Sequence, residues 1–142
     1  LACKPSNIEG LQECQTVFYR SPESIETHLN EEKSTIDFKA DIWSIGCVMA
    51  ELILGEPLFY QKTSINLKKQ QKEGGFDRFN RKVYPIIARE LKSICFIPSK
   101  IEKLFGEIGS YTQFLSLLKR CLEKDKEKRI SVEEALNHKF FL

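Results

Sequence analysis

The sequence lacks the features that mark several common classes of protein. No apolar run approaches the ~20 residues that a helix needs to cross a bilayer, and the first residues lack the basic-then-apolar pattern of a secretory signal. Basic and acidic residues nearly balance, 22 against 20, for a net charge of +2. Nucleic-acid-binding domains usually carry a strongly basic face. We therefore expect neither a membrane nor a nucleic acid as a partner.

The number and positions of cysteine and methionine residues are also informative. The five cysteines are odd in number and unevenly spaced, and neither they nor the two histidines have metal-ligand spacing, so no metal site is predicted. Cys47 and Cys121 fall in apolar helical patterns, where a free thiol behaves as a small hydrophobe. A reducing compartment, cytoplasmic or nuclear, fits this usage best. The only methionine, Met49, lies inside the most apolar segment, so we expect the chain to be a piece of a longer protein.

What is present is a helical pattern over most of the 142 residues. Ser21 and Pro22 form a start signal for a short helix to about Leu29. From Asp41 to Leu54 apolar residues cover more than one stripe, which predicts a helix buried on most sides. Gly55 stands in the position that commonly ends a helix. Residues 1–20 are predicted to be a loop, and residues 30–37 a polar connector.

The second half continues the helical pattern with weaker signals. Thr63 or Ser64 caps a predicted polar helix to about Glu73, which Gly74 and Gly75 stop. Helical spacing recurs over residues 86–94 and 101–108, then more strongly from Phe114 to Leu122. Ser131 with Glu134 forms a capping box that opens a final helix through His138. The sequence therefore predicts a mainly α fold.

Three motifs occur in order: YRSPE (Tyr19–Glu23), DIWSIGCVMAEL (Asp41–Leu52) and RISVEEALNHKFF (Arg129–Phe141). Together they resemble the C-terminal, helical lobe of a eukaryotic protein kinase, and LACKPS at the start is similar to the residues that follow the D-F-G motif. The resemblance implies a kinase-like fold without its N-lobe. It divides the chain into an activation segment (1–23), a buried central helix (41–54), a group-specific insert region (roughly 60–110) and closing helices (111–142).

The Tyr-Arg pair before Ser-Pro-Glu resembles the CMGC group of kinases. So does the long stretch between Phe59 and Tyr111, where that group carries an insert. Within the group, QTVFYRSPE is most similar to the dual-specificity tyrosine-regulated, Clk-like and cyclin-dependent branches. The implied parent activity is transfer of the ATP γ-phosphate to protein Ser/Thr, with dual specificity left open.

The resemblance assigns structural roles to several residues. It pairs Glu23 with Arg129, a buried ion pair that would clamp the activation segment to the last helices; two unrelated surface charges are the alternative. Asp41 would accept hydrogen bonds from the backbone of the catalytic loop, or would simply favour the dipole at the start of its helix. Trp43 belongs to the central-helix motif. Glu13 stands where relatives carry a phosphorylated residue, and is either a fixed negative charge or a solvated loop residue.

Peptide binding is implied for a second set. Thr16 matches the threonine that contacts the catalytic residues in Ser/Thr kinases, although a loop threonine making a local backbone bond is the alternative. Tyr19 and Arg20 would shape the pocket for the residue after the phosphoacceptor. Val17 replaces an Arg that favours proline-directed substrates in many members, which leaves that preference open.

The chain lacks the Gly-rich loop, the strand Lys and the two Asp residues that phosphoryl transfer requires. ATP and Mg²⁺ are therefore expected for the parent kinase, and neither for this chain alone. Expected partners are a protein substrate, the missing N-lobe and catalytic loop, and a regulatory protein at residues 60–110. The basic residues there are read as a docking or phosphate-binding patch, or as a solvated helix face. The other readings of the chain are a non-catalytic, pseudokinase-like or truncated binding module, and a self-contained helical adaptor.

Overall fold

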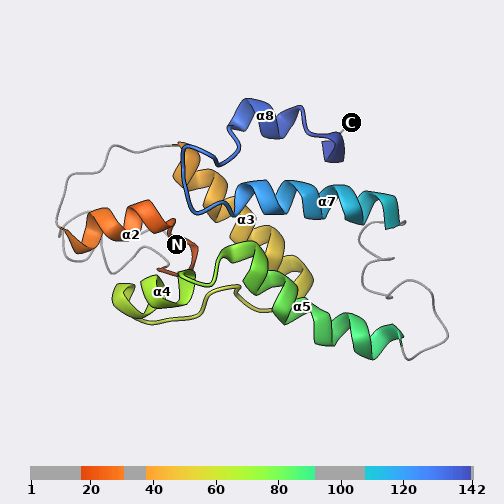
Figure 1. The fold of residues 1–142 in the computed structure, drawn as a ribbon, viewed down its shortest axis with the longest axis horizontal. Helices are drawn as coiled ribbons and strands as arrows, with labels where there is room; N and C mark the ends of the chain where they lie inside the picture. Colours follow the sequence, from red (N-terminus) through yellow and green to blue (C-terminus); the bar gives the residue numbers. More distant parts are fainter. Residues whose placement is uncertain (1–16, 31–37, 92–107, 142) are drawn as a thin grey trace, which may run out of the picture.

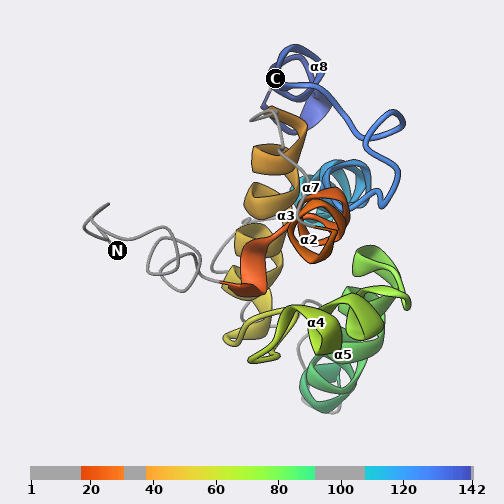
Figure 2. The same cartoon turned by 90° about the vertical axis from the view of Figure 1, so that its left-hand side faces the viewer.

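The computed structural model describes residues 17–30, 38–91 and 108–141, and every regular element in those ranges is helical (Figure 1). Helix α3 runs through the middle of the fold and contacts both α7 and α5, which also contact each other (Figure 1). Helices α2 and α4 lie against each other, and α4 also contacts η1 (Figure 2). The elements are η1 (Val17–Tyr19), α2 (Pro22–Leu29), α3 (Phe38–Leu54), α4 (Ser64–Gln71), α5 (Gly75–Leu91), α7 (Ile108–Cys121), α8 (Val132–Leu136) and η2 (Lys139–Phe141).

The central helix was predicted to begin at Asp41; it begins three residues earlier, at Phe38. Its end is as predicted, with Gly55 at φ 75°, a conformation that glycine adopts without strain. The predicted burial on most sides is wrong for this structure. Four apolar side chains of α3 are largely exposed: Phe38 (73%), Ile45 (51%), Val48 (45%) and Leu52 (63%).

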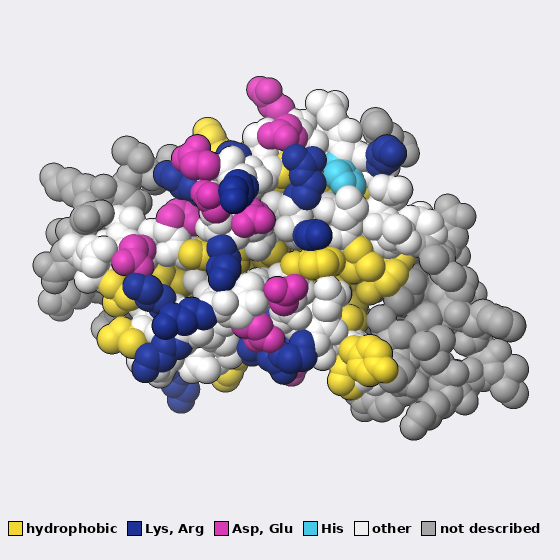
Figure 3. Space-filling model, in the orientation of Figure 1, with side chains coloured by type: hydrophobic (Ala, Val, Ile, Leu, Met, Phe, Trp, Pro, Cys, Tyr) yellow, Lys and Arg dark blue, Asp and Glu magenta, His cyan; other side chains and the backbone are white. Residues whose placement is uncertain are grey.

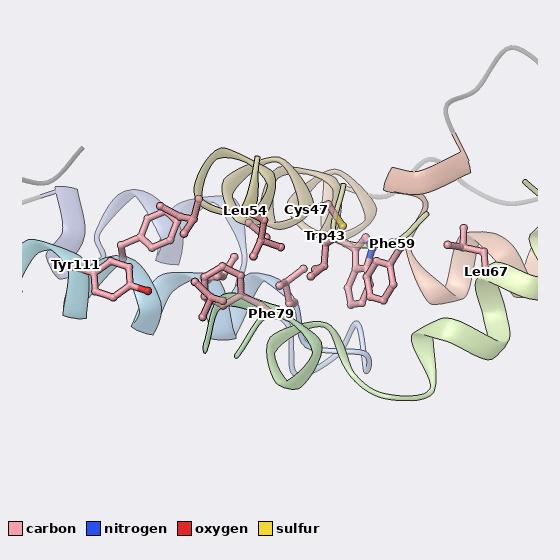
Figure 4. Packing of buried hydrophobic residues seen from close by; sticks show 14 of the residues in the cluster. Trp43, Cys47, Leu54, Phe59, Leu67, Phe79 and Tyr111 are labelled. Carbon is pink, nitrogen blue, oxygen red and sulfur yellow. The ribbon is translucent and has the colours of Figure 1, made fainter. Parts of the chain in front are cut away.

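The core lies on the opposite side of α3. Trp43 and Phe59 are fully buried and their rings stack at 5.9 Å between centroids (Figure 4). Phe79 from α5 and Leu118 from α7 belong to the same buried cluster, so three helices share one interior. Helix α3 approaches the end of α7 closely at Gly46, where an added Cβ would lie 2.9 Å from Leu122 Cδ2.

Three predicted helix starts are confirmed. Ser21 Oγ accepts the Ser24 N–H at the start of α2, and Thr63 Oγ1 accepts the Asn66 N–H at the start of α4. Ser131 and Glu134 make the predicted capping box. Each cap supplies an acceptor for a helix N–H group that has no partner within the helix.

Two further helix boundaries were predicted incorrectly. Helix α8 ends at Leu136 and not at His138, since the His138 N–H turns back to the Ala135 carbonyl and a 3-10 turn follows. A stop was predicted at Gly74 and Gly75, but Gly75 is the first residue of helix α5. Only Gly74, at φ 89°, has a backbone conformation that interrupts the helical path. Helix α5 also contains Pro85 in its interior. The predicted helix at 101–108 lies outside the described residues except for its last position. In the described part, no helix is long and apolar enough to cross a membrane.

Candidate functional site

The predicted ion pair between Glu23 and Arg129 is present. Arg129 Nη1 donates to Glu23 Oε1 at 2.6 Å and Nη2 donates to Oε2 at 2.9 Å, a bidentate arrangement. The Arg129 side chain is fully buried, whereas a quarter of the Glu23 side chain is exposed. The pair therefore ties the first turn of α2 to the segment just before α8, across 106 positions of sequence.

The remaining donors of Arg129 bind main-chain carbonyls. Nε donates to Glu123 O at 2.8 Å, Nη1 to Lys39 O at 2.7 Å and Nη2 to Lys124 O at 3.3 Å. The guanidinium also lies over the Trp43 ring, 5.3 Å from its centroid. A planar group with five donors can make all of these contacts, and a lysine ammonium cannot, which explains why arginine stands here.

The electrostatics of Glu23 follow from this geometry. Burial works to raise the pKa of the Glu23 carboxyl, but hydrogen bonds from Arg129 and from the backbone, together with the positive charge of Arg129, outweigh it. The net result is a pKa below the ordinary value. Glu23 is therefore held as a carboxylate in the folded protein.

The Tyr-Arg segment ahead of Glu23 is anchored on the central helix. The Tyr19 hydroxyl donates to Glu51, with both carboxylate oxygens at 2.9 Å, and Ser44 Oγ donates to the Tyr19 carbonyl at 2.7 Å. Burial and the neighbouring carboxylate raise the pKa of the Tyr19 phenol, so it stays protonated and able to donate. Side chain and main chain of Tyr19 are thus both fixed by α3.

Helix α4 holds the next residue. The Gln71 side-chain amide donates to the Arg20 carbonyl at 2.8 Å, and Arg20 Nη1 donates weakly to Ser64 Oγ at 3.5 Å. The Gln71 side chain is buried, and its Oε1 has no hydrogen-bond partner among the described residues. Burial lowers the pKa of the Arg20 guanidinium. The segment from Tyr19 to Arg20 is consequently held between α3 and α4.

The other predicted site residues are placed as follows. Glu13 and Thr16 lie outside the described residues, and Val17 is described only as part of the η1 backbone. Asp41 is exposed in the first turn of α3, three residues after the helix begins. Trp43 is buried between Phe59 and the Arg129 guanidinium.

Sequence reasoning missed the residues that hold the Tyr-Arg segment in place. Ser44 lies inside the quoted central-helix motif, so a role was available to prediction but was not assigned. Glu51 carried only a weak signal, as a carboxylate at the polar edge of an apolar helix. Gln71 carried none, because a glutamine in a polar, lysine-rich helix gives no sign of being buried.

The basic residues between positions 68 and 82 are mostly paired. Lys68 binds Glu26 at 2.6 Å, Arg78 and Arg81 both contact Glu73, and Lys82 contacts Glu56 at 2.9 Å. Blue side chains gather over α4 in the space-filling view, on a surface that also carries acidic groups (Figure 3). This pairing favours the solvated helix face over a phosphate-binding patch.

The two described cysteines have no reactive character. Cys47 and Cys121 are free and buried, and burial raises the pKa of both thiols, that of Cys121 to about 11. A thiol that stays protonated is a poor nucleophile and a poor metal ligand. Both cysteines therefore serve as core residues.

Comparison with known proteins places this arrangement in a family. The family described as the protein kinase domain matches residues 2–141. The mitogen-activated protein kinase p38b of Drosophila melanogaster is 32% identical over 96% of this chain and 37% of its own length. The serine/threonine-protein kinase prpf4B of Dictyostelium discoideum is 30% identical, over 87% of this chain and 18% of its own. Human mitogen-activated protein kinase 13 is 33% identical, over 89% and 34%.

The chain belongs to the protein kinase family. Its described helices, without a strand among them, fit the C-terminal lobe of that fold, as the motifs predicted. Mitogen-activated protein kinases are members of the group that the Tyr-Arg pair and the long insert region indicated, so the group is supported. The branch within the group stays a prediction. The chain spans 18–37% of the length of the three relatives compared.

Proposed function

We propose that this chain is the C-terminal-lobe portion of a Ser/Thr protein kinase, and that it supplies the activation segment and the platform that binds the peptide substrate. The parent protein would transfer the γ-phosphate of ATP to a protein hydroxyl. The observation that carries the proposal is the double anchoring of the Tyr19–Arg20 segment on α3 and α4, next to a clamp made by Glu23 and Arg129. A segment fixed from three sides is suited to holding a peptide in one place.

This chain would take no catalytic step by itself. Phosphoryl transfer depends on positioning and on neutralising the phosphate charge. The Lys and Asp residues that do this, and that hold Mg²⁺, belong to motifs that the 142 residues do not contain. Within the described residues no group of three His, Cys, Asp or Glu side chains could hold a metal ion. We therefore assign ATP and Mg²⁺ binding to the rest of the parent.

The exposed face of α3 supports the proposal that ATP and Mg²⁺ bind to other parts of the parent protein. Phe38, Ile45, Val48 and Leu52 recur at intervals of seven and three or four residues, which places them on one stripe of the helix. A contiguous apolar stripe in water marks a surface that packs against something else. We propose that the N-lobe and the catalytic loop of the parent pack on this side, in keeping with the first-turn position of Asp41.

The deciding experiment begins with the coding sequence ahead of Leu1. If it encodes Asp-Phe-Gly directly before Leu1, a catalytic-loop Asp and a strand Lys further back, the full-length protein should transfer phosphate from labelled ATP to Ser/Thr peptides. This chain alone should transfer none. A closed reading frame, or substitution of those Asp and Lys residues, would contradict the kinase proposal and leave a binding module built on a kinase lobe.

A further inference from the structure

An exposed aromatic pair lies beside the Tyr-Arg segment. Phe18 in η1 and Tyr60 in the loop before α4 are 42 positions apart, yet their ring centroids are 4.8 Å apart at a tilt of 35°. Tyr60 is 59% exposed and Phe18 is partly buried, so the pair presents aromatic surface to solvent. A single exposed aromatic needs no explanation. Two rings brought together from distant segments and left open form a surface that a ligand can use.

The main chain that carries the two rings is held by adjacent glutamines of α4. Gln70 Oε1 accepts the Tyr60 N–H at 3.0 Å, while the buried Gln71 donates to the carbonyl of Arg20, two residues after Phe18. Helix α4 also contacts α2 and η1 (Figure 2). The main chain beside both rings is thus held by one helix, and support of this kind from a helix makes a binding site more precise than a loop alone would.

We propose that Phe18 and Tyr60 form an apolar subsite for the peptide substrate, one that receives a side chain other than the residue directly after the phosphoacceptor. The inference rests on the proposed function, since it extends the same platform. Its occupant is an apolar or aromatic side chain, because two ring faces offer dispersion contact and no charge. Aromatic residues on a rigid framework are also the side chains that most often dominate binding energy at interfaces. Gln71 is a positioning residue for this subsite.

The test uses the full-length protein and a set of Ser peptides in which each position in turn is Leu or Gln. The ratio of kcat/KM for Leu over Gln should reach about tenfold at one position beyond the neighbour of the phosphoacceptor, the discrimination that a modest apolar contact supplies. Tyr60→Ala should reduce this ratio below about threefold, and Tyr60→Phe should retain it because the ring and not the hydroxyl makes the contact. Gln71→Met should lower the ratio by loosening the Arg20 main chain.

Tyr84→Ala is the matched control, since Tyr84 is an exposed tyrosine (72%) on α5 away from the pair, and its ratio should equal that of the unsubstituted protein. Two results would overturn the subsite while leaving the kinase proposal intact. The first is the absence of a Leu preference at every such position. The second is a Tyr60→Ala protein that keeps the preference or loses activity equally toward all peptides. If the protein transfers no phosphate, the proposed function fails. The same peptide pairs then test the subsite by fluorescence anisotropy, where equal binding of Leu and Gln peptides overturns it.

Discussion

The two faces of α3 have similar apolar side chains and opposite surroundings. One face carries Trp43, Cys47 and Ile53 into the shared core with Phe79 and Leu118. The other presents Phe38, Ile45, Val48 and Leu52 to solvent. Side-chain hydrophobicity alone therefore does not predict which face of α3 the other described residues cover. The faces differ in what packs against them. Helices α5 and α7 cover the buried face, whereas the described residues leave the four apolar side chains of the other face largely exposed.

Arg129→Met should have the largest effect on stability. It would remove the partner of a partly buried carboxylate and leave three carbonyls without their donor. Breaking a buried pair on one side costs about 3–5 kcal/mol, and the partial exposure of Glu23 favours the lower end of that range. Urea unfolding of the purified chain measures the loss.

Arg120→Met provides the control for that variant. Arg120 donates to Glu134 at 3.0 Å, but both side chains are about half exposed. Exposed pairs contribute about 0–1 kcal/mol. Equal losses for Arg120→Met and Arg129→Met would show that burial of the Glu23–Arg129 pair has no energetic consequence.

Adjacent positions of α3 offer a direct contrast between its faces. Ile53→Ala should lower the free energy of unfolding by about 2–5 kcal/mol, because it opens a cavity in the core. Leu52→Ala, on the exposed face, should change it by less than about 0.5 kcal/mol. Light scattering should show less self-association of the Leu52→Ala protein, since it removes exposed apolar surface. A large loss of stability from Leu52→Ala would mean that this face is covered in the isolated chain.

Two glycines test how closely α3 and α7 pack. Gly46→Ala would place a Cβ 2.9 Å from Leu122 Cδ2 and 3.0 Å from Cys121 Cβ, and overpacking of this kind costs about 1–3 kcal/mol. Gly109→Ala in α7 has nothing within 4 Å of the added Cβ and should stabilise the helix by about 0.5–1 kcal/mol. Thermal unfolding of the two variants should move in opposite directions. A stabilised Gly46→Ala protein would contradict the close approach.

The smallest expected effect is a pH dependence at the C-terminal end. The His138 Nδ1 accepts the Phe140 N–H at 3.1 Å, and its Nε2 lies 3.1 Å from Ser116 Oγ. Burial, then the positive charges of Arg120 and Lys139, lower the pKa of His138 below its ordinary value of 6.5. The fold therefore favours neutral imidazole, and this contribution is present above pH 6.5 and lost as pH falls through the lowered pKa.

Unfolding midpoints in urea at about pH 7.5 and about pH 5 measure this contribution. The stability of the unsubstituted chain should fall more over that interval than the stability of a His138→Gln variant, which has no imidazole to protonate. Identical pH dependence in the two proteins would exclude His138 as the source.

Much of the fold was predictable because its signals are local. The caps at Ser21, Thr63 and Ser131 and the terminating Gly55 each act through one helical turn, so residue type and spacing were sufficient. The partnership of Glu23 with Arg129 was predictable only through the family resemblance of its motifs. Nothing in the composition of either segment indicates that they meet across 106 positions.

The contacts that shape the candidate peptide site were not predictable, because they depend on packing. Gln71 belongs to a polar helix, and its burial follows from the way α4 lies against η1 and α2. The contact between the Phe18 and Tyr60 rings likewise depends on where the loop before α4 passes. Helix α5 begins at Gly75, eleven residues before the predicted helical segment at 86–94, since Gly74 and Gly75 together suggested a stop that only Gly74 provides.

The sequence by itself determined the helical class, the capped starts of α2, α4 and α8 and the kinase motifs, because periodicity, capping and motif spacing are properties of neighbouring residues. Only the tertiary structure decided which face of α3 is buried, which glutamine holds the Arg20 carbonyl and which aromatic rings remain exposed to solvent. Those outcomes depend on segments that are distant in the chain and meet only after the helices pack.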